Sequence, residues 1–188
     1  MRVRYDGSLV RWGQSGYGLS DMPTDNDFVD IGAGAHAAFA VRANGSLVAW
    51  GEDSHTMGIL NVPSGNDFIM VSGGIDYCLA LKLDGSLLMW GQSGYGLSNM
   101  PTDNAFINIG AIGSHAAFAV RSDGSLVAWG EDSHNVGILN VPSGNDFIDV
   151  AGGIDHALAL TPIPIPGAVI LGSIGLGFSG WLCRRKRI

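Results

Sequence analysis

Three short apolar runs recur in a fixed order along the chain. The first reads DFVDIG at 27–32, the second reads AAFAVR at 37–42, and the third reads SLVAWG at 46–51. The step Asn44-Gly45 separates the second run from the third. Such runs are typical of β-strands, and an Asn-Gly or Asp-Gly step is a strong hairpin signal because both turn positions need positive φ. The pattern therefore predicts small antiparallel sheets.

The third run is apolar on both faces. Alternate side chains of a strand point to opposite sides, so Leu47 and Ala49 share one face. Val48 and Trp50 share the other. A strand with two apolar faces fits a sheet that is packed between two neighbouring sheets.

The same unit occurs four times. Its Trp-Gly step returns at spacings of 38, 40 and 39 residues, a period typical of repeat architectures. About three or four short antiparallel strands per period make a β-propeller blade. The sequence therefore predicts an all-β propeller over residues 1–161. The repeat tryptophans, expected to be structural, are Trp12, Trp50, Trp90 and Trp129.

Four repeats are few for a closed ring. The chain starts inside a repeat with MRVRYDG and reaches the same place in the cycle at HALAL, so SLVRW at 8–12 could complete the last blade. Each blade turns about 51° in a ring of seven blades but about 90° in a ring of four, the smallest ring known. We expect an open arc or a fragment of a larger ring, with a closed four-bladed ring as the alternative.

The repeat resembles a known family. The segments SGGIDYCLALKLDGSLLMWG, AGGIDHALAL and WGEDSHNVGILNVP are similar to regulator of chromosome condensation repeats, most of all to the short bacterial version. The resemblance implies a β-propeller, typically of seven blades. The family includes a nucleotide-exchange factor and a bacterial inhibitor of β-lactamase. The resemblance also implies that the histidines of the repeat are structural residues bonded to neighbouring backbone, namely His36, His115 and His156.

A polar segment, EDSH, follows two of the tryptophans at 52–55 and 131–134. Adjacent side chains of an extended loop point to alternating sides, so a Ser–His contact within the segment is not expected, and catalysis needs such contacts. We therefore predict no catalytic residues and interpret the loops as partner contacts. Tyrosine offers a large contact area at low entropic cost. The candidates for partner binding are Tyr17, Tyr95, Asp53, His55, Asp132 and His134.

Metal and cofactor sites are not predicted. The three repeat histidines would bind a metal only if they lined the axis together. The segments TDND and SGND lack the spacing of a calcium loop, and turn-capping Asp and Asn explain them better. No glycine-rich phosphate loop follows a strand and opens a helix.

Charge is divided between the body and the C-terminal end of the chain. Before Pro162 there are 17 acidic and six basic residues, which gives a net charge of −11, whereas the end of the chain carries +4. An acidic body is repelled by phosphates, which argues against a nucleic-acid partner.

The segment after residue 161 departs from the repeat. Prolines at 162–166 form a spacer, and 17 uncharged residues follow at 167–183. As a helix this run spans about 25 Å, close to the ~30 Å hydrocarbon core of a bilayer. Its basic end favours the cytoplasmic side. We expect a transmembrane helix within 167–188; a buried helix capping the propeller end is the alternative.

This order of spacer, apolar helix and basic end resembles the PEP-CTERM tail of Gram-negative bacteria. The resemblance implies recognition by an exosortase-like sorting enzyme, export, and at least transient anchoring in the cell envelope. Because MRVRYDGSLV contains no apolar leader region, we expect the chain to begin downstream of a signal peptide. The expected sorting residues are Pro164, Pro166, Gly167, Arg184, Arg185, Lys186 and Arg187.

Together these features predict an exported, surface-associated, non-enzymatic binding or scaffold protein for a protein or glycan partner. An inhibitor-like or exchange-factor-like propeller is the alternative by family analogy. A third hypothesis is a hydrolase that uses His and Asp side chains around the axis.

Overall fold

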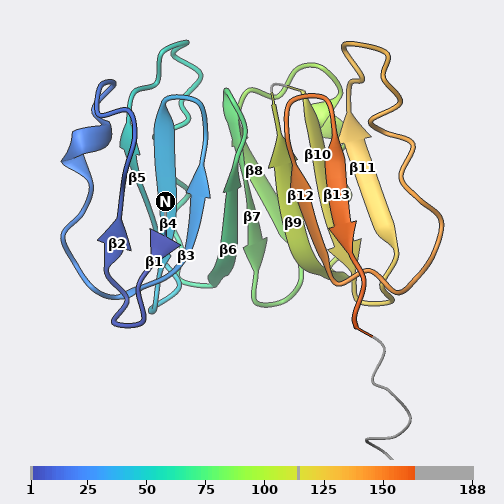
Figure 1. Ribbon diagram of the computed structural model, residues 1–188, viewed down its shortest axis with the longest axis horizontal. Coiled ribbons are helices and arrows are strands. Elements are labelled where there is room, and N and C mark those ends of the chain that lie inside the picture. The colour runs from blue at the N-terminus through green and yellow to red at the C-terminus, as the bar shows by residue number, and fades with distance from the viewer. Residues whose placement is uncertain (1, 114, 164–188) are drawn as a thin grey trace, which may run out of the picture.

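Five small antiparallel sheets stand side by side in chain order (Figure 1). The computed structural model describes residues 2–113 and 115–163. The sheets consist of β1 (Arg2–Val3) and β2 (Leu9–Val10); β3 (Phe28–Ala33), β4 (Ala37–Arg42) and β5 (Leu47–Gly51); β6 (Phe68–Gly73), β7 (Tyr77–Lys82) and β8 (Leu87–Gly91); β9 (Phe106–Ile112), β10 (Ala116–Arg121) and β11 (Leu126–Gly130); and β12 (Asp149–Gly152) and β13 (Ala157–Leu160).

The sheets form an open arc of propeller blades, as predicted. The first strand of each sheet packs on that of the next, from β3 to β6, β9 and β12, while β1 packs on β3. The β1–β2 sheet packs on the second sheet and the β12–β13 sheet packs on the fourth, in front of it in Figure 1, so these two sheets form the ends of the arc. Apolar residues remain exposed at both ends, Trp12 at 68% and Leu158 at 69%. β2 and β13 belong to separate sheets at the two ends of the arc, so SLVRW does not complete the last blade of its own chain.

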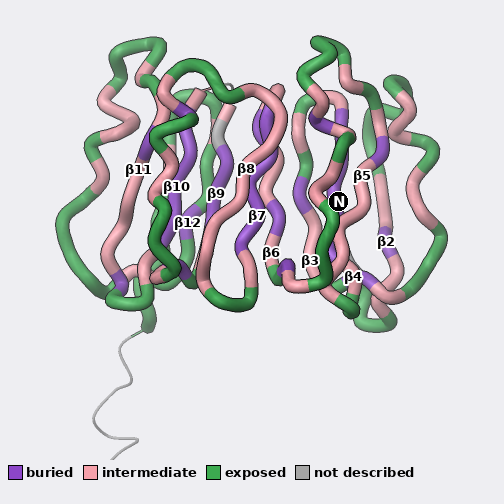
Figure 2. Tube along the Cα trace, turned by 180° about the vertical axis from the view of Figure 1, so that it is seen from behind, coloured by how far each residue is buried: buried purple, intermediate pink, exposed green. Residues whose placement is uncertain are grey.

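Cores lie between successive sheets, as the two-faced strands predict. Leu47 and Ala49 join the core between the second and third sheets. Val48 and Trp50 join the core between the first and second. The buried residues follow the strands, whereas the connecting loops are mostly exposed (Figure 2). Each blade is therefore held mainly by hydrophobic burial against its two neighbours.

The hairpin turns differ from the predicted type. Gly45 has φ 80°, but Asn44 is not among the residues with positive φ. The side-chain oxygen of Asn44 accepts hydrogen bonds from the backbone N–H (3.0 Å) and hydroxyl (2.8 Å) of Ser46. The Gly45 N–H donates to the Arg42 carbonyl at 2.8 Å. The expectation that both turn positions need positive φ is therefore wrong, because an Asx turn holds the first residue and only the glycine is left-handed.

The acidic segments before the first strands hold ion pairs. Arg42, at the end of β4, contacts Asp25 at 2.7 Å and Asp27 at 2.8 Å. Its guanidinium also lies 4.9 Å from the centre of the Phe28 ring. The next two sheets repeat the arrangement with Lys82–Asp67 and Arg121–Asp103. Aspartates of TDND at 24–27, SGND at 64–67 and TDNA at 102–105 thus pair with a cation on the second strand of the sheet that follows.

The repeat tryptophans occupy unequal positions. Trp50 and Trp129 are buried, and Trp90 is half-buried with its indole N–H donating to the Ile59 carbonyl at 2.8 Å. Trp12 is exposed, because no described sheet packs on its face.

The described residues contain no helix long and apolar enough to cross a bilayer. Their helical elements are two short 3-10 helices, η1 (Leu19–Asp21) and η2 (Leu97–Asn99), which pack on β5 and β11. The predicted transmembrane helix and the sorting residues from Pro164 onward lie outside the described residues.

Candidate partner-binding edge

One edge of the arc gathers the polar and aromatic side chains that the sequence singles out. It is the upper edge in Figure 1, where β12 joins β13 and where the loops leaving each third strand begin. We call it the upper edge throughout. Its interacting side chains are Tyr17, His36, Ser54, His55, Asp76, Tyr95, His115, Ser133, His134 and Asp155.

Two tyrosines pack their rings against histidines of the next sheet, one stacked and one tilted. The ring of Tyr17, in the loop after β2, lies 4.1 Å from that of His36, just before β4. Tyr95 repeats this contact with His115 at 3.8 Å. The tyrosines remain 45% and 49% exposed, so one ring face is fixed while the rest is open to a partner.

Both tyrosines have a left-handed backbone, with φ 56° at Tyr17 and at Tyr95. This conformation costs a non-glycine residue about 1–2 kcal/mol. Such outliers persist where the surrounding structure holds them, and they cluster at functional sites. The repeated geometry therefore marks these two positions as candidates for function.

The histidines bond to serines of their own sheet. His36 Nδ1 lies 2.7 Å from Ser54 Oγ, and His115 Nδ1 lies 2.7 Å from Ser133 Oγ. The family resemblance implies bonds to backbone for these histidines, and the structure adds these side-chain partners. The hydroxyls come from the EDSH segments, which fold back over the first loop of the sheet.

Tyr77 and His156 occupy the positions equivalent to His36 and His115 in the other two repeats, and they differ from them. Tyr77 is buried, and its hydroxyl donates to the backbone carbonyl of Ala116 in the next sheet. His156, in the end sheet, is exposed. The partners of His36, His115 and Tyr77 thus lie within the same sheet or in the next one.

The EDSH histidines form ion pairs with the following sheet. His55 Nδ1 lies 2.6 Å from Asp76 Oδ1, and His134 Nδ1 lies 2.5 Å from Asp155 Oδ1. The hydrogen bond to the carboxylate raises the pKa of each histidine, and Coulomb attraction adds to this. Each pair links the loop leaving one sheet to the first hairpin of the next.

Asp53 and Asp132 hold the backbone of their own loops. The Asp53 carboxylate accepts hydrogen bonds from the Met57 N–H at 2.9 Å and the Gly58 N–H at 2.7 Å. Asp132 makes the equivalent bonds to Val136 and Gly137. The two aspartates shape the loops on which the histidines are carried.

This geometry separates the residues of the EDSH segment. Ser54 and His55 have different partners, from different sheets. In a serine-nucleophile site a carboxylate orients the imidazole that activates the serine. The imidazole that contacts Ser54 is that of His36, and it is stacked on the ring of Tyr17. Within the described residues, no group of three or more His, Cys, Asp or Glu side chains could hold a metal ion. The upper edge therefore presents a row of aromatic and polar side chains that are held in place by contacts with neighbouring residues.

The two His–Asp pairs make stability depend on pH. The pKa of each histidine is raised above the ordinary 6.5 in the folded chain, so the folded state holds the protons more tightly. The contribution is fully present below about pH 6.5 while the carboxylates are ionised, and it is lost as pH rises through the raised pKa.

We expect His55→Gln/His134→Gln to melt below the wild-type chain at about pH 5.5, with the difference closing by about pH 8.5. Thermal melts across this range measure the difference. A difference that does not change with pH would contradict the ion-pair account.

Comparisons with known proteins bear on the fold. No family model matches the chain, and no curated protein matches it in sequence. Solved structures do match. The chain is 18% identical to yeast RCC1 (Prp20) in its complex with Kap60, with a TM-score of 0.58 over 74% of this chain and 43% of that one.

Two further structures agree. Prp20p from Saccharomyces cerevisiae, described with its binding to Gsp1p and histones, is 18% identical, with a TM-score of 0.56 over 81% of this chain and 48% of that one. The CRINKLY WD40 ectodomain of the Arabidopsis thaliana receptor kinase ACR4 is 20% identical, with a TM-score of 0.54 over 71% and 45%. The chain spans less than half the length of these structures. The likeness establishes the fold, and the described chain is an open arc of RCC1-like propeller blades.

Proposed function

We propose that this chain is a non-enzymatic binding or scaffold module whose upper edge contacts a protein partner. The observation that carries the proposal is the pair of half-exposed tyrosines, Tyr17 and Tyr95, each held in a left-handed conformation and packed against a histidine. Pre-ordered aromatic side chains bind with little further loss of conformational freedom. His55 and His134 extend the same surface.

Charge and the comparisons support a protein partner. Glu52 and Glu131 are exposed at the upper edge, and the body before Pro162 has 17 acids against six bases. A partner with a basic surface complements this charge. Two of the similar structures are of proteins described with protein partners, namely Kap60, Gsp1p and histones. Inhibitor-like or exchange-factor-like action, and a glycan partner, are alternatives.

The test compares tyrosines at the two edges of the arc. We expect Tyr17→Ala/Tyr95→Ala to lose most partner capture from envelope extracts, with circular dichroism unchanged. Tyr5→Ala is the control, because Tyr5 is fully exposed in the β1–β2 turn, at the opposite edge. If both variants captured the same proteins as the wild-type chain, the upper edge would not be the binding surface.

We also propose export and envelope anchoring through residues 164–188, on the resemblance of this segment to a sorting tail. With an export leader added, the full chain is expected to stay in the membrane pellet after carbonate extraction. Replacing Ile170, Leu171 and Ile174 by lysine should release it, because each charge is costly within a bilayer. Release of the unchanged chain would argue against the anchor.

A further inference from the structure

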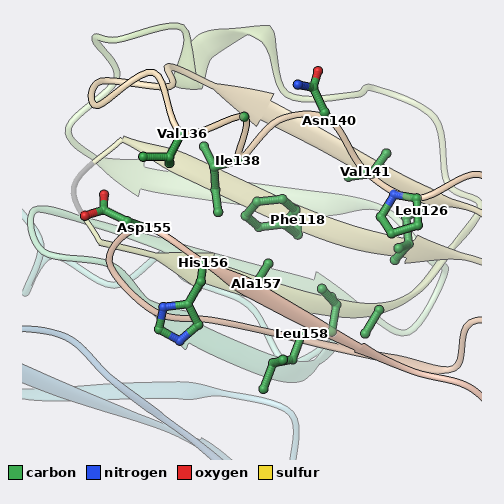
Figure 3. A pocket seen from close by; sticks show the side chains of 14 residues that line it. Phe118, Leu126, Val136, Ile138, Asn140, Val141, Asp155, His156, Ala157 and Leu158 are labelled. Atoms are coloured by element: carbon green, nitrogen blue, oxygen red, sulfur yellow. The ribbon is translucent and has the colours of Figure 1, made fainter.

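A cavity opens beside the last sheet. It has a volume of about 330 Å³ and lies between the β10–β11 strands, the loop that follows them, and the β12–β13 sheet. Phe118 points into it, with Ile138 on one side and Ala157 on the other (Figure 3). Most of its lining residues are apolar, beside Asn140, Asp155 and His156, so an apolar side chain with a polar group at its end fits it.

The chain contains a filled version of the same space, between its second and third sheets. The duplicated unit places Phe39 and Ile59 at the positions of Phe118 and Ile138. There, Leu88 and Trp90 of β8 fill the space beside them. Trp90 meets the Phe39 ring edge-on at 5.9 Å and donates to the Ile59 carbonyl. In the described residues, β13 has no third strand to supply such side chains.

The strand that would fit lies at the other end of the arc. GSLVRWG at 7–13 matches GSLLMWG at 85–91, which puts Val10 and Trp12 at the positions of Leu88 and Trp90. Trp12 is 68% exposed, while Leu9 is buried against the second sheet. β2 pairs with β1 through only two residue pairs, on the edge that β8 presents to β7, so in an exchange β13 of the other copy would replace β1 on this edge.

We propose that two copies of this chain join end to end, with β2 of each copy forming the third strand of the other copy's β12–β13 sheet. Trp12 of one copy then fills the cavity against Phe118 of the other. The register of β7 with β8 sets Leu158 opposite Arg11. Leu158 and Leu160, exposed at 69% and 54%, become covered by the second sheet of the other copy, as their repeat equivalents Leu79 and Leu81 are covered.

The geometry favours a closed pair. The cavity and β2 lie at opposite ends of one arc (Figure 1), so a copy does not fill its own cavity. Each copy contributes three complete sheets and, with the exchange, one composite sheet, which makes a ring of eight. Propellers of about four to eight blades are known, and the turn per blade falls only from about 51° in seven to about 45° in eight. A two-fold pair uses both ends and leaves none open.

Cysteine cross-linking of the full chain in mild detergent tests the proposal. Arg11→Cys with Leu158→Cys, in a Cys183→Ser background, puts thiols on residues that lie opposite each other in the composite sheet, within reach of a disulfide. Oxidation is expected to convert most of the chain to a covalent species of two copies and nothing larger. Arg11→Cys with Ala159→Cys is the matched control, since a one-residue shift puts the thiols on opposite faces.

Trp12→Glu in the cross-linking chain should abolish the two-copy species with circular dichroism unchanged. Leu83→Glu, at an exposed turn residue away from both ends, should leave it unchanged. The proposal is overturned if the thiols stay unlinked, as they would with residues 164–188 in the cavity. It is also overturned if the species persists with Trp12→Glu, or if a ladder of longer species shows open chains instead of a ring.

Discussion

Replacing Phe39 with alanine is expected to lower the free energy of unfolding by about 3–5 kcal/mol. Phe39 has no exposed surface and lies in the core between the second and third sheets. Its ring meets Trp90 edge-on, a contact that adds about 0.5–1.5 kcal/mol to burial. Alanine leaves a cavity at the contact between two blades, so the loss weakens both sheets. Urea unfolding followed by circular dichroism measures the change.

Phe118→Ala is the matched control, because Phe118 stands in the same AAFAVR segment one duplicated unit later. It borders a cavity where Phe39 has Trp90. In a Trp12→Glu chain, which removes end-to-end association, we expect Phe118→Ala to cost at least about 1 kcal/mol less than Phe39→Ala. Equal losses would show that the third strand adds nothing to the core.

The strands and their packing were predictable because each depends on a local pattern. Leu47 and Val48 lie in different cores, as alternation along the strand predicts. The period of the Trp-Gly step predicts successive blades. The turn of about 51° per blade in a ring of seven predicts that four such blades form an open arc. These features depend on the geometry of a single strand or a single repeat, and that geometry can be predicted from the local order of residues.

The contacts of the upper edge were not predictable in the same way. The candidate residues Tyr17, His55 and their repeats are all there, but their partners come from other sheets. Asp76 lies 21 residues after His55. The sequence of the strand before Asp76 does not indicate that its carboxylate pairs with a histidine. The left-handed backbone of Tyr17 runs against its residue type. Only the register between neighbouring sheets brings these groups together, and no local pattern encodes that register.

The exposure of Trp12 has a similar cause. Its own segment matches those of the buried tryptophans, but its burial depends on a sheet that packs against it from outside the segment. The hairpin turn at Asn44 and Gly45 depends instead on a local side-chain contact. The dipeptide predicts a turn, while the side chain of Asn44, bonded to Ser46, decides which turn forms.

The glycine after the tryptophan is expected to be as sensitive as the core. At Gly51, φ is +113° and a Cβ would lie 2.3 Å from the His36 carbonyl oxygen. That oxygen accepts the Glu52 N–H at 2.9 Å, so a side chain at Gly51 would push apart the loop that carries His36.

We expect Gly51→Ala to cost about 3 kcal/mol, from about 1–2 kcal/mol of left-handed strain and the loss of about one backbone hydrogen bond. Gly13→Ala is the control, because Gly13 has the same place in the first repeat with φ +92° and no atom within 4 Å of a Cβ. In the Trp12→Glu chain it should cost only the strain. Since the composite sheet would place Gly13 against the first hairpin of the last sheet, Gly13→Ala in the chain that keeps Trp12 should weaken pairing as well. If the two glycines responded alike in the Trp12→Glu chain, backbone strain alone would explain both and the clash at His36 would carry no cost.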